Sequence, residues 1–489
     1  MNLLLVTRLL GIVSWLIGLT MAFSLPAAWP AVGGQSEFER NAFWALIFSI
    51  AISLFIGALL RHWGRKAPDT LFRKEAMAIV GLSWVLATVL GAMPFYLAKV
   101  KFRNDAAGQP VRMGVAECLF ESQSGFSTTG ATVLTDIENE EWVPRCLLFW
   151  RSSTHFLGGL GIIVLFVAVL GQGSAGKALM RAEMPGPSKE GSQERMQHTA
   201  WIFAAIYCGL NLVLAIVLKL EGMTWFEAIC HAFGTMATGG FSTLNASLGG
   251  FGSTAIDYTV ILFMILAGTN FTLLYLTLIG KGRILLKDSE WLAYVGIILA
   301  STVLIIAFGM FVTNDFDPGG QFSTGQRIEL AIRQALFQVV AILTTTGFGT
   351  ADYDQWHSFS RALLIVMMFV GGCAGSTGGG MKVIRHILFV KILRRGVEHS
   401  YHPSVVRHIR LGGESLVDPD LPRNILLYFG LVALIFTASS QVLVGIEPDS
   451  TWTVSGQPLN NKLIDSASAV AATLHNIGPG IGLVGPTQN

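Results

Sequence analysis

The chain of 489 residues contains 52% hydrophobic and 13% charged residues, and its formal net charge is only +2. Soluble domains carry about 25% charged residues, and the charges here are clustered, which leaves apolar runs of about 20 residues, enough to cross a bilayer. The composition excludes an ordinary soluble globular protein, predicts a membrane protein with many spans, and gives no support for nucleic-acid binding.

The five cysteines form no recognisable framework, because their number is odd and no CxxC pair is present. A disulfide or metal framework is therefore not expected. The apolar run Leu9–Leu25 follows the single charge of Arg8. It is interpreted as a first membrane helix rather than a signal peptide, because the chain continues as alternating spans.

An N-terminal transmembrane helix pair in residues 1–66 precedes a repeated pattern. Each repeat contains a long apolar helix, a shorter segment, a glycine-rich turn and a second long helix. We expect repeat one in 67–195, repeat two in 196–287, repeat three in 288–396, and a cytosolic basic loop with an incomplete repeat four in 397–489.

The helices expected from the hydrophobic pattern are, in chain order, Leu9–Leu25, Phe43–Leu60, Ala76–Ala98, Gly114–Gln123, Arg145–Leu170, Thr199–Lys219, Trp225–Met236, Ala255–Ile279, Trp291–Val312, Ile328–Leu343, Arg361–Leu393, Asn424–Val444 and Leu463–Leu474. Nine of them are long enough to span a bilayer. The shorter ones each lead into a glycine-rich turn.

Four small, glycine-containing turns follow the shorter helices: Ser124–Val133, Ala237–Thr243, Thr344–Thr350 and His475–Gly482. Irregular backbone at membrane depth is tolerated only where protein or trapped water satisfies its polar groups. The glycines at 130, 239, 347 and 478 are 109, 108 and 131 residues apart. Two nearly equal intervals predict duplicated units, and the third is longer because a basic loop is inserted before the fourth copy.

These turns have the composition of an ion-selectivity filter. A dehydrated cation needs oxygen ligands, which rings of backbone carbonyls supply, and glycine allows the backbone to turn its carbonyls toward an axis. Threonine hydroxyls add further oxygens. The candidate potassium ligands are Thr128, Thr129, Gly130, Thr238, Gly239, Thr345, Thr346, Gly347, Asn476, Ile477 and Gly478.

The second helix of repeat three is interrupted by the run GGCAGSTGGGMK, Gly371–Lys382. Each glycine inside a helix costs about 1 kcal/mol relative to alanine, so this run predicts a broken helix that lines a cavity and can move. The alternative is close helix packing through small residues. The candidate gate residues are Gly371, Gly372, Gly375, Ser376, Thr377, Gly378, Gly379, Gly380 and Lys382, the last of which would oppose a cation.

An orientation with the N-terminus inside places 20 of the 33 Lys and Arg residues on the inner side, in agreement with the positive-inside rule. The same orientation places all four glycine turns in the outer half, together with many of the acids. Acidic residues around a mouth would raise the local cation concentration.

Other chemical motifs are weaker. Gly171–Lys177 matches a phosphate-binding loop, but Ala178 stands where Ser or Thr would bind magnesium. An intramembrane hydrolase that uses Ser376 with a histidine such as His386 is a second hypothesis, although no orienting carboxylate is evident. His155 is expected to be a packed, hydrogen-bonded histidine, and Arg151 is expected to extend toward the membrane interface.

The motifs STTGATV, ATGGFST and TTTGFGT, with the segment Trp150–Leu165, closely resemble the Trk/Ktr/HKT superfamily of potassium transporters, and within it the TrkH-type membrane subunit. The resemblance covers the whole chain, and the N-terminal helix pair favours the Trk type. It implies an all-α membrane protein with four helix–pore-loop–helix repeats around a central pore, one filter glycine in each repeat, and a gate in the broken helix of repeat three.

The resemblance further implies potassium uptake across a bacterial cytoplasmic (inner) membrane, with potassium as the transported ion and no organic cofactor on this chain. A homodimer bound to a cytosolic, nucleotide-binding ring of the TrkA type is expected, surrounded by membrane lipid. A symporter of potassium with protons or sodium is the alternative. Two departures stand out: Pro479 follows the fourth glycine, and the last inner helix is missing, which we expect to reflect truncation of the sequence.

Overall fold

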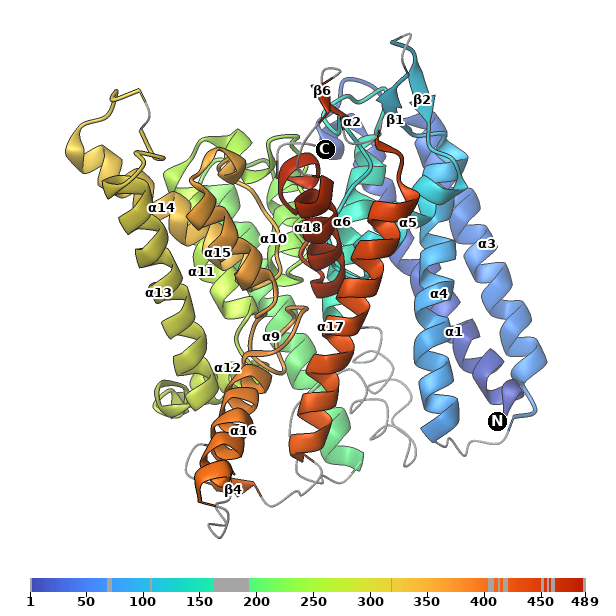
Figure 1. Ribbon diagram of the computed structural model, residues 1–489. Helices are drawn as coiled ribbons and strands as arrows, with labels where there is room; N and C mark the ends of the chain where they lie inside the picture. Colours follow the sequence, from blue (N-terminus) through green and yellow to red (C-terminus); the bar gives the residue numbers. More distant parts are fainter. Residues whose placement is uncertain are drawn as a thin grey trace. The chain divides into compact units, whose positions relative to one another are not determined.

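The computed structural model describes residues 2–67, 73–105, 108–161, 193–317, 319–402, 409–411, 414–416, 421–449, 453–454, 457–458 and 462–486. It is almost entirely helical (Figure 1). The chain divides into two units. Unit 1 comprises Met1–Ala267 and Thr346–Thr350, and unit 2 comprises Gly268–Thr345 and Ala351–Gln488.

Six helices in the described part of the chain are long and apolar enough to cross a membrane, and one bent helix pair raises the number to seven. Nine spans were expected. The difference arises in repeats one and three: residues 162–192 lie outside the described part, and the second helix of repeat three is interrupted. The structure is therefore that of a multi-span helical membrane protein.

In unit 1 the N-terminal helices α1 (Leu3–Ala22) and α3 (Arg40–Gly64) pack side by side (Figure 1). Small residues allow the close approach, because a Cβ on Gly11 would meet the carbonyl oxygen of Gly57. Ser14 Oγ donates to the carbonyl of Ser53 at 2.6 Å, which satisfies a buried hydroxyl. The connection contains η1 (Leu25–Ala28) and α2 (Pro30–Gly33).

The segment predicted as repeat one continues unit 1 with a long helix, a hairpin and two further helices. The elements are α4 (Arg73–Ala98), the antiparallel strands β1 (Lys101–Asn104) and β2 (Pro110–Arg112), α5 (Val115–Phe126) and α6 (Arg145–Leu160). Helix α5 extends three residues beyond its expected end at Gln123, so the first turn begins later than the sequence indicated. Phe126 and Trp150 pack edge to face in the buried core between α5 and α6.

The segment predicted as repeat two, with the end of the one before it, supplies α9 (Gln193–Leu220), α10 (Trp225–Met236), η2 (Ser247–Phe251) and α11 (Thr254–Ala267) to unit 1. Helix α10 has the bounds expected from the sequence. A capping box explains its start: Thr224 accepts from Glu227 N at 3.2 Å, and Glu227 accepts from Thr224 N at 2.8 Å.

The second helix of repeat two is broken, whereas the sequence predicted one continuous helix over Ala255–Ile279. Helix α11 ends at Ala267, and α12 (Phe271–Leu276) begins after a break of three residues. Asn270 caps α12 by accepting from Thr272 N at 2.8 Å. Apolar composition does not reveal this break, since Gly268 and Asn270 are the only local signals.

Unit 2 begins with α12 and continues through η3 (Thr277–Lys281) and η4 (Leu285–Lys287) to α13 (Ser289–Phe311). The segment predicted as repeat three includes α13 and continues with α14 (Thr324–Leu343), η5 (Tyr353–Gln355), α15 (Ser358–Met368) and α16 (Val383–Tyr401). Helix α14 starts four residues earlier than expected, because Gln326 accepts from Ser323 N at 3.1 Å and caps it.

The rest of unit 2 contains α17 (Leu421–Ile446), α18 (Lys462–His475) and η7 (Gly482–Val484). Two small antiparallel hairpins flank α17: β3 (Ile409–Leu411) with β4 (Glu414–Leu416), and β5 (Thr453–Val454) with β6 (Gln457–Pro458). Helix α18 extends one residue beyond the expected segment at each end.

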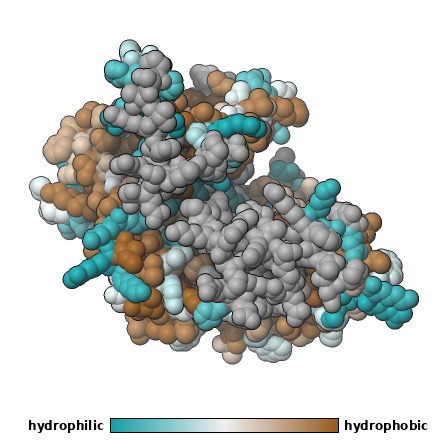
Figure 2. Space-filling model, turned by 90° about the horizontal axis from the view of Figure 1, so that it is seen from below, coloured by the Kyte–Doolittle hydropathy of each residue, from teal (hydrophilic) through white to brown (hydrophobic). Residues whose placement is uncertain are grey.

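Large apolar side chains are exposed along the spanning helices, as at Phe55 in unit 1 and Leu434 in unit 2. Such exposure is unfavourable in water and natural in lipid. Seen from below, the described residues combine hydrophobic surface with projecting hydrophilic side chains (Figure 2). Exposed basic residues lie at the end of α3, at Arg61, and directly after it, at Arg65 and Lys66.

Candidate functional site: four glycine turns and an interrupted helix

The four turns share one backbone pattern. In each, a residue with positive φ follows the end of a helix, and a glycine with positive φ comes two residues later. The pairs are Thr128 and Gly130 (59° and 81°), Thr238 and Gly240 (54° and 78°), Thr345 and Gly347 (61° and 76°), and Asn476 and Gly478 (65° and 97°). Repetition of this uncommon conformation at four places supports a common origin for the turns.

This pattern changes the register of the second turn. Gly239 was expected to match the glycines of the other turns, but its backbone position corresponds to Thr129, Thr346 and Ile477, while Gly240 has the positive φ. Two adjacent glycines made the sequence ambiguous, and backbone conformation resolves it. Gly240 therefore joins the candidate site, and Gly239 stays in it at the middle position.

Each turn is stabilised by bonds back to its helix, which offset the strain of a non-glycine residue at positive φ, about 1–3 kcal/mol. The N–H of Thr128 binds the Gly125 carbonyl at 3.1 Å, and the N–H of Thr129 binds the Ser124 carbonyl at 2.9 Å. The second and fourth turns repeat both bonds. These two bonds are typical of a right-handed helix that ends at a residue with left-handed backbone conformation.

Within unit 1, the turns approach one another too closely for a side chain. A Cβ on Gly130 would overlap the carbonyl oxygen of Gly239, and a Cβ on Gly240 would overlap that of Thr346. In both cases a positive-φ glycine faces the middle carbonyl of the following turn. Glycine is therefore required both for its conformation and for its lack of a side chain.

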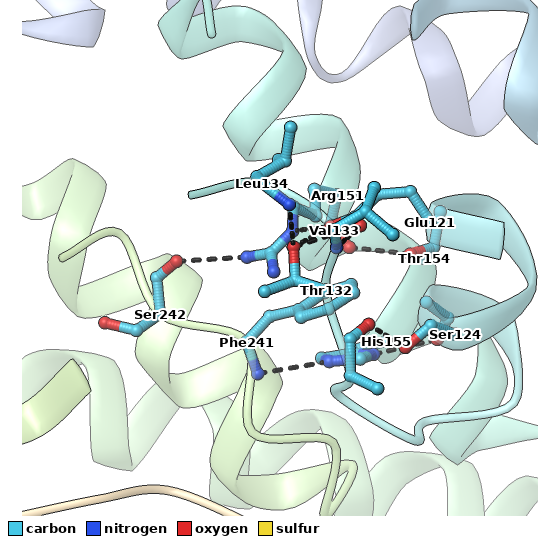
Figure 3. A network of polar contacts seen from close by, with 12 residues as sticks. Glu121, Ser124, Thr132, Val133, Leu134, Arg151, Thr154, His155, Phe241 and Ser242 are labelled. Carbon is cyan, nitrogen blue, oxygen red and sulfur yellow. Dashed lines mark hydrogen bonds and ion pairs between the residues drawn. The ribbon is translucent and has the colours of Figure 1, made fainter. Parts of the chain in front are cut away.

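A buried ion pair supports the first two turns (Figure 3). Arg151 Nε lies 2.5 Å from Glu121 Oε1, and both side chains are almost completely buried. Glu121 also accepts from Thr132 Oγ1 at 2.9 Å, and Arg151 Nη1 donates to the Ser242 carbonyl at 3.1 Å. The expectation that Arg151 extends to the membrane interface is wrong, because Glu121 neutralises it inside the protein.

His155 connects the same two turns (Figure 3). Its Nδ1 lies 2.8 Å from the Gly125 carbonyl oxygen, and its Nε2 lies 3.2 Å from the Phe241 amide nitrogen. The carbonyl can only accept and the amide can only donate, so Nδ1 carries the proton and the imidazole is neutral. The ring stacks on Phe241 with centroids 4.0 Å apart, which agrees with the expected packed histidine.

The segment Thr346–Thr350 is held in unit 1 by η2. The N–H of Gly249 donates to the Gly349 carbonyl at 3.0 Å, and the N–H of Gly349 donates to Ser247 Oγ at 3.2 Å. These two bonds, one in each direction, position the second half of the third turn.

The fourth turn is held in unit 2 by the segment that follows the third. Tyr353 OH donates to the Gly480 carbonyl at 2.7 Å, and the N–H of Gly482 donates to Asp354 Oδ2 at 3.1 Å. Burial raises the pKa of Asp354, and the Gly482 N–H opposes that rise. Ser468 Oγ also accepts from the Ile481 N–H at 3.0 Å.

The interruption predicted in repeat three is present, because α15 ends at Met368 and α16 begins at Val383. Gly371, Gly375 and Gly380 have positive φ in the intervening loop. Within unit 2 the N–H of Gly379 donates to Thr345 Oγ1 at 2.6 Å. This bond joins the loop to a candidate filter residue.

The side chain of Lys382 binds the backbone of the interrupting loop. Its ammonium group donates to the carbonyls of Gly378 and Gly379, in the second case at 3.3 Å. The charge is therefore bound to carbonyl oxygens of the loop, and the loop and the lysine form one positively charged structure.

A family model for TrkH, described as a cation transport protein, matches residues 43–488. This chain belongs to that family. The Trk system potassium uptake protein TrkH of Escherichia coli (strain K12) is 33% identical over 483 residues, which cover 98% of this chain and 91% of the relative. TrkG of the same strain is 30% identical over 482 residues, 98% of this chain and 90% of the relative.

A solved structure of a TrkH-family member agrees with this assignment. The crystal structure of the potassium transporter TrkH from Vibrio parahaemolyticus is similar with a TM-score of 0.77 and 30% identity, covering 99% of this chain and 92% of that chain. The resemblance noted in the sequence is thus confirmed, and so is the expectation of a helical membrane transporter rather than an enzyme.

The local contacts also disfavour the hydrolase hypothesis. Ser376 Oγ donates to the Cys373 carbonyl at 2.7 Å, and His386 Nδ1 faces the Lys382 carbonyl at 3.3 Å. The serine is thereby used within its own loop. The match to a phosphate-binding loop at Gly171–Lys177 lies outside the described residues.

Sequence reasoning missed three supporting groups: the buried Glu121–Arg151 pair, the segment Tyr353–Asp354, and Gly240. A buried Glu in a short helix and an Arg in the following span were visible signals for the first, since membrane-embedded charges usually pair. The second left no signal, because its bonds join residues more than 120 positions apart.

Proposed function

We propose that this TrkH-family chain takes up potassium across a membrane through a pore lined by the four turns. The observation that supports this most is the same pair of positive-φ residues after the ends of four helices. Relatives at 33% and 30% identity are named Trk system potassium uptake proteins. A pore made of one chain needs the same structure four times, and the four turns supply it.

The filter would consist of carbonyl oxygens from the positions of Thr128 to Gly130 and their equivalents, with threonine hydroxyls as additional ligands. Oxygens at several levels replace the hydration shell of a potassium ion. Thr128 Oγ1 and Thr238 Oγ1 each donate to the preceding carbonyl at 2.6 Å. A hydroxyl that donates its proton in this way can still act as an acceptor through its oxygen.

The gate would be the loop Gly371–Lys382. Its contact with Thr345 and the positive charge of Lys382 support this role. In this arrangement the loop opposes the passage of a cation, and conduction requires it to move.

The remaining expectations belong to the same proposal. The chain would be a multi-pass protein of a bacterial inner membrane with its N-terminus inside. Two copies would form a homodimer, which would bind a cytosolic nucleotide-binding ring of the TrkA type. The exposed basic residues after α3 and in Lys281–Lys287 support the orientation.

The experiment is growth rescue of bacteria that lack potassium uptake, in medium with low potassium. The full chain should restore growth. Gly347→Ser should restore it only in medium that contains less sodium, because a Cβ at φ 76° disturbs the filter backbone. Gly296→Ser is the matched control, since a Cβ there meets open space. Failure of the unaltered chain to restore growth, although it reaches the membrane, would contradict the proposal.

A further inference from the structure

In the loop Gly371–Lys382, which interrupts a helix, the first half is held by hydrogen bonds to neighbouring elements of unit 2. The N–H of Cys373 donates to the Gly268 carbonyl at 2.9 Å, and the N–H of Phe271 donates to the Gly375 carbonyl at 3.0 Å. The break between α11 and α12 thus provides the partners that the broken helix lacks. Two interrupted helices satisfy each other's backbone groups, as membrane depth requires.

Ala374 lies between Cys373 and Gly375, and its backbone N–H is bound by a side chain from a third element. Glu290, in the first turn of α13, accepts from the Ala374 N–H at 2.8 Å through Oε1. The same oxygen accepts from the Ile384 N–H at 3.0 Å, in the first turn of α16. One buried carboxylate therefore connects the beginning of the loop to the helix that follows it.

The charge of Glu290 has a counterpart in the same loop. The ammonium of Lys382 attracts the carboxylate and at the same time binds the Gly378 and Gly379 carbonyls. The two N–H groups and the ammonium all favour a negative charge at this point, and the N-terminus of α16 adds the favourable end of its dipole.

The second half of the loop makes a different kind of contact. Its bond to a neighbouring turn is the one from the Gly379 N–H to Thr345 Oγ1. Lys382 donates to the Gly379 carbonyl, and its charge interacts with that of Glu290. Glu290 thereby acts on both halves, through hydrogen bonds on one and through charge on the other.

We propose that Glu290 is the positioning residue that holds the loop Gly371–Lys382 against Thr345, and so stabilises the non-conducting arrangement. This inference rests on the proposed function, because it assigns an effect on conduction. A contact shifts an equilibrium only if it is stronger in one state. The bond from Ala374 to Glu290 is present in the arrangement in which Gly379 contacts Thr345, and the proposal requires that it weaken when the loop moves away.

The test is passive potassium flux through the full chain in vesicles, without any partner. Glu290→Ala should raise flux about tenfold, since two bonds to a charged group are lost. Glu290→Gln keeps an acceptor oxygen in place and loses only the charge, so we expect a rise of about two- to threefold. The permeability ratio of potassium to sodium should stay unchanged in both, because the filter backbone is intact.

Glu75→Ala is the matched control. Glu75 is a buried carboxylate in unit 1 that also accepts from a backbone N–H, that of Asn2 at 2.9 Å, whereas the loop belongs to unit 2. Its replacement should leave flux at the level of the unaltered chain. A rise equal to that of Glu290→Ala would show a general loss of packing and overturn the inference.

Deletion of Gly375–Gly380 separates this inference from the proposed function. If the deletion raises flux and both Glu290 variants do not, Glu290 has no positioning role and the gate stands. If Glu290→Ala does not reach the membrane, the two- to threefold rise in Glu290→Gln decides, and unchanged flux there contradicts the inference. If the unaltered chain and the deletion both carry no potassium above empty vesicles, the proposed function fails.

Discussion

At the scale of single residues, the two glycines of the second turn have different reasons for lacking a side chain. Gly240 has a φ of 78°, and a Cβ on it would overlap the Thr346 carbonyl. A Cβ on Gly239 would instead meet the ring of His155. One constraint is in the backbone and the other is a side-chain neighbour that can be removed.

A double-mutant cycle distinguishes these constraints. After His155→Ala, the further change Gly239→Ala should cost little thermal stability, because the neighbour is gone, whereas Gly240→Ala should cost as much as it does alone. The melting temperatures of the purified variants in detergent provide the measurement. Additive effects at Gly239 would contradict the assignment of His155 as its limiting neighbour.

The Glu121–Arg151 pair should be a strong contributor to stability. Glu121→Gln leaves a buried arginine without its counter-charge, and breaking such a pair costs about 3–5 kcal/mol. Glu329→Gln, which disrupts the pair of Glu329 with Arg333 on α14, is the control and should cost about 0.3–0.5 kcal/mol because that pair is partly exposed. Similar losses of melting temperature in the two variants would show that the buried pair contributes no more to stability than the partly exposed pair.

At the scale of elements, the long apolar helices were predictable because length and hydropathy determine them. The starts of α10 and α14 follow capping residues that the sequence displays. The break before α12 was not predictable, since its backbone groups bind Cys373 and Gly375, about 100 residues away. A helix is encoded locally, whereas an interruption depends on the partner that satisfies it.

The connection between the fourth turn and Asp354 should depend on pH. Burial is the largest cause that raises the pKa of Asp354, the Gly482 N–H and Arg361 lower it, and Asp352 and Asp465 raise it. A folded pKa above the ordinary value of 3.8 means that the stability contributed by the protonated form is complete below about pH 3.8. That contribution is lost as the pH rises through the raised value.

Asp354→Asn keeps an acceptor for Gly482 and removes the titration. Its melting temperature relative to the unaltered chain should therefore increase between pH 4 and neutrality. Asp449→Asn is a suitable control, because the pKa of this exposed residue is lowered by Lys462 and its stability effect has the opposite sign. If the difference in melting temperature between Asp354→Asn and the unaltered chain is constant over the pH range, the buried position of Asp354 is contradicted.

At the scale of the whole molecule, the sequence predicted the family, the helical class and the location of the four turns. Within the turns, three of the four glycine positions agree with the backbone pattern, and the fourth shifts by one residue to Gly240. The contacts that position the turns were not predictable in the same way. Ion pairs and backbone bonds between distant segments leave no periodic signal in a single sequence.

The central claim is that potassium ions pass through the turns, with the ion gradient as the driving force. The direct measurement is the reversal potential of the full chain in a lipid bilayer, with potassium, sodium and proton gradients varied one at a time. We expect the potential to follow potassium alone, and Gly347→Ser to make it respond to sodium as well. A potential in the unaltered chain that moves with the proton or sodium gradient at fixed stoichiometry would indicate a symporter and contradict this account.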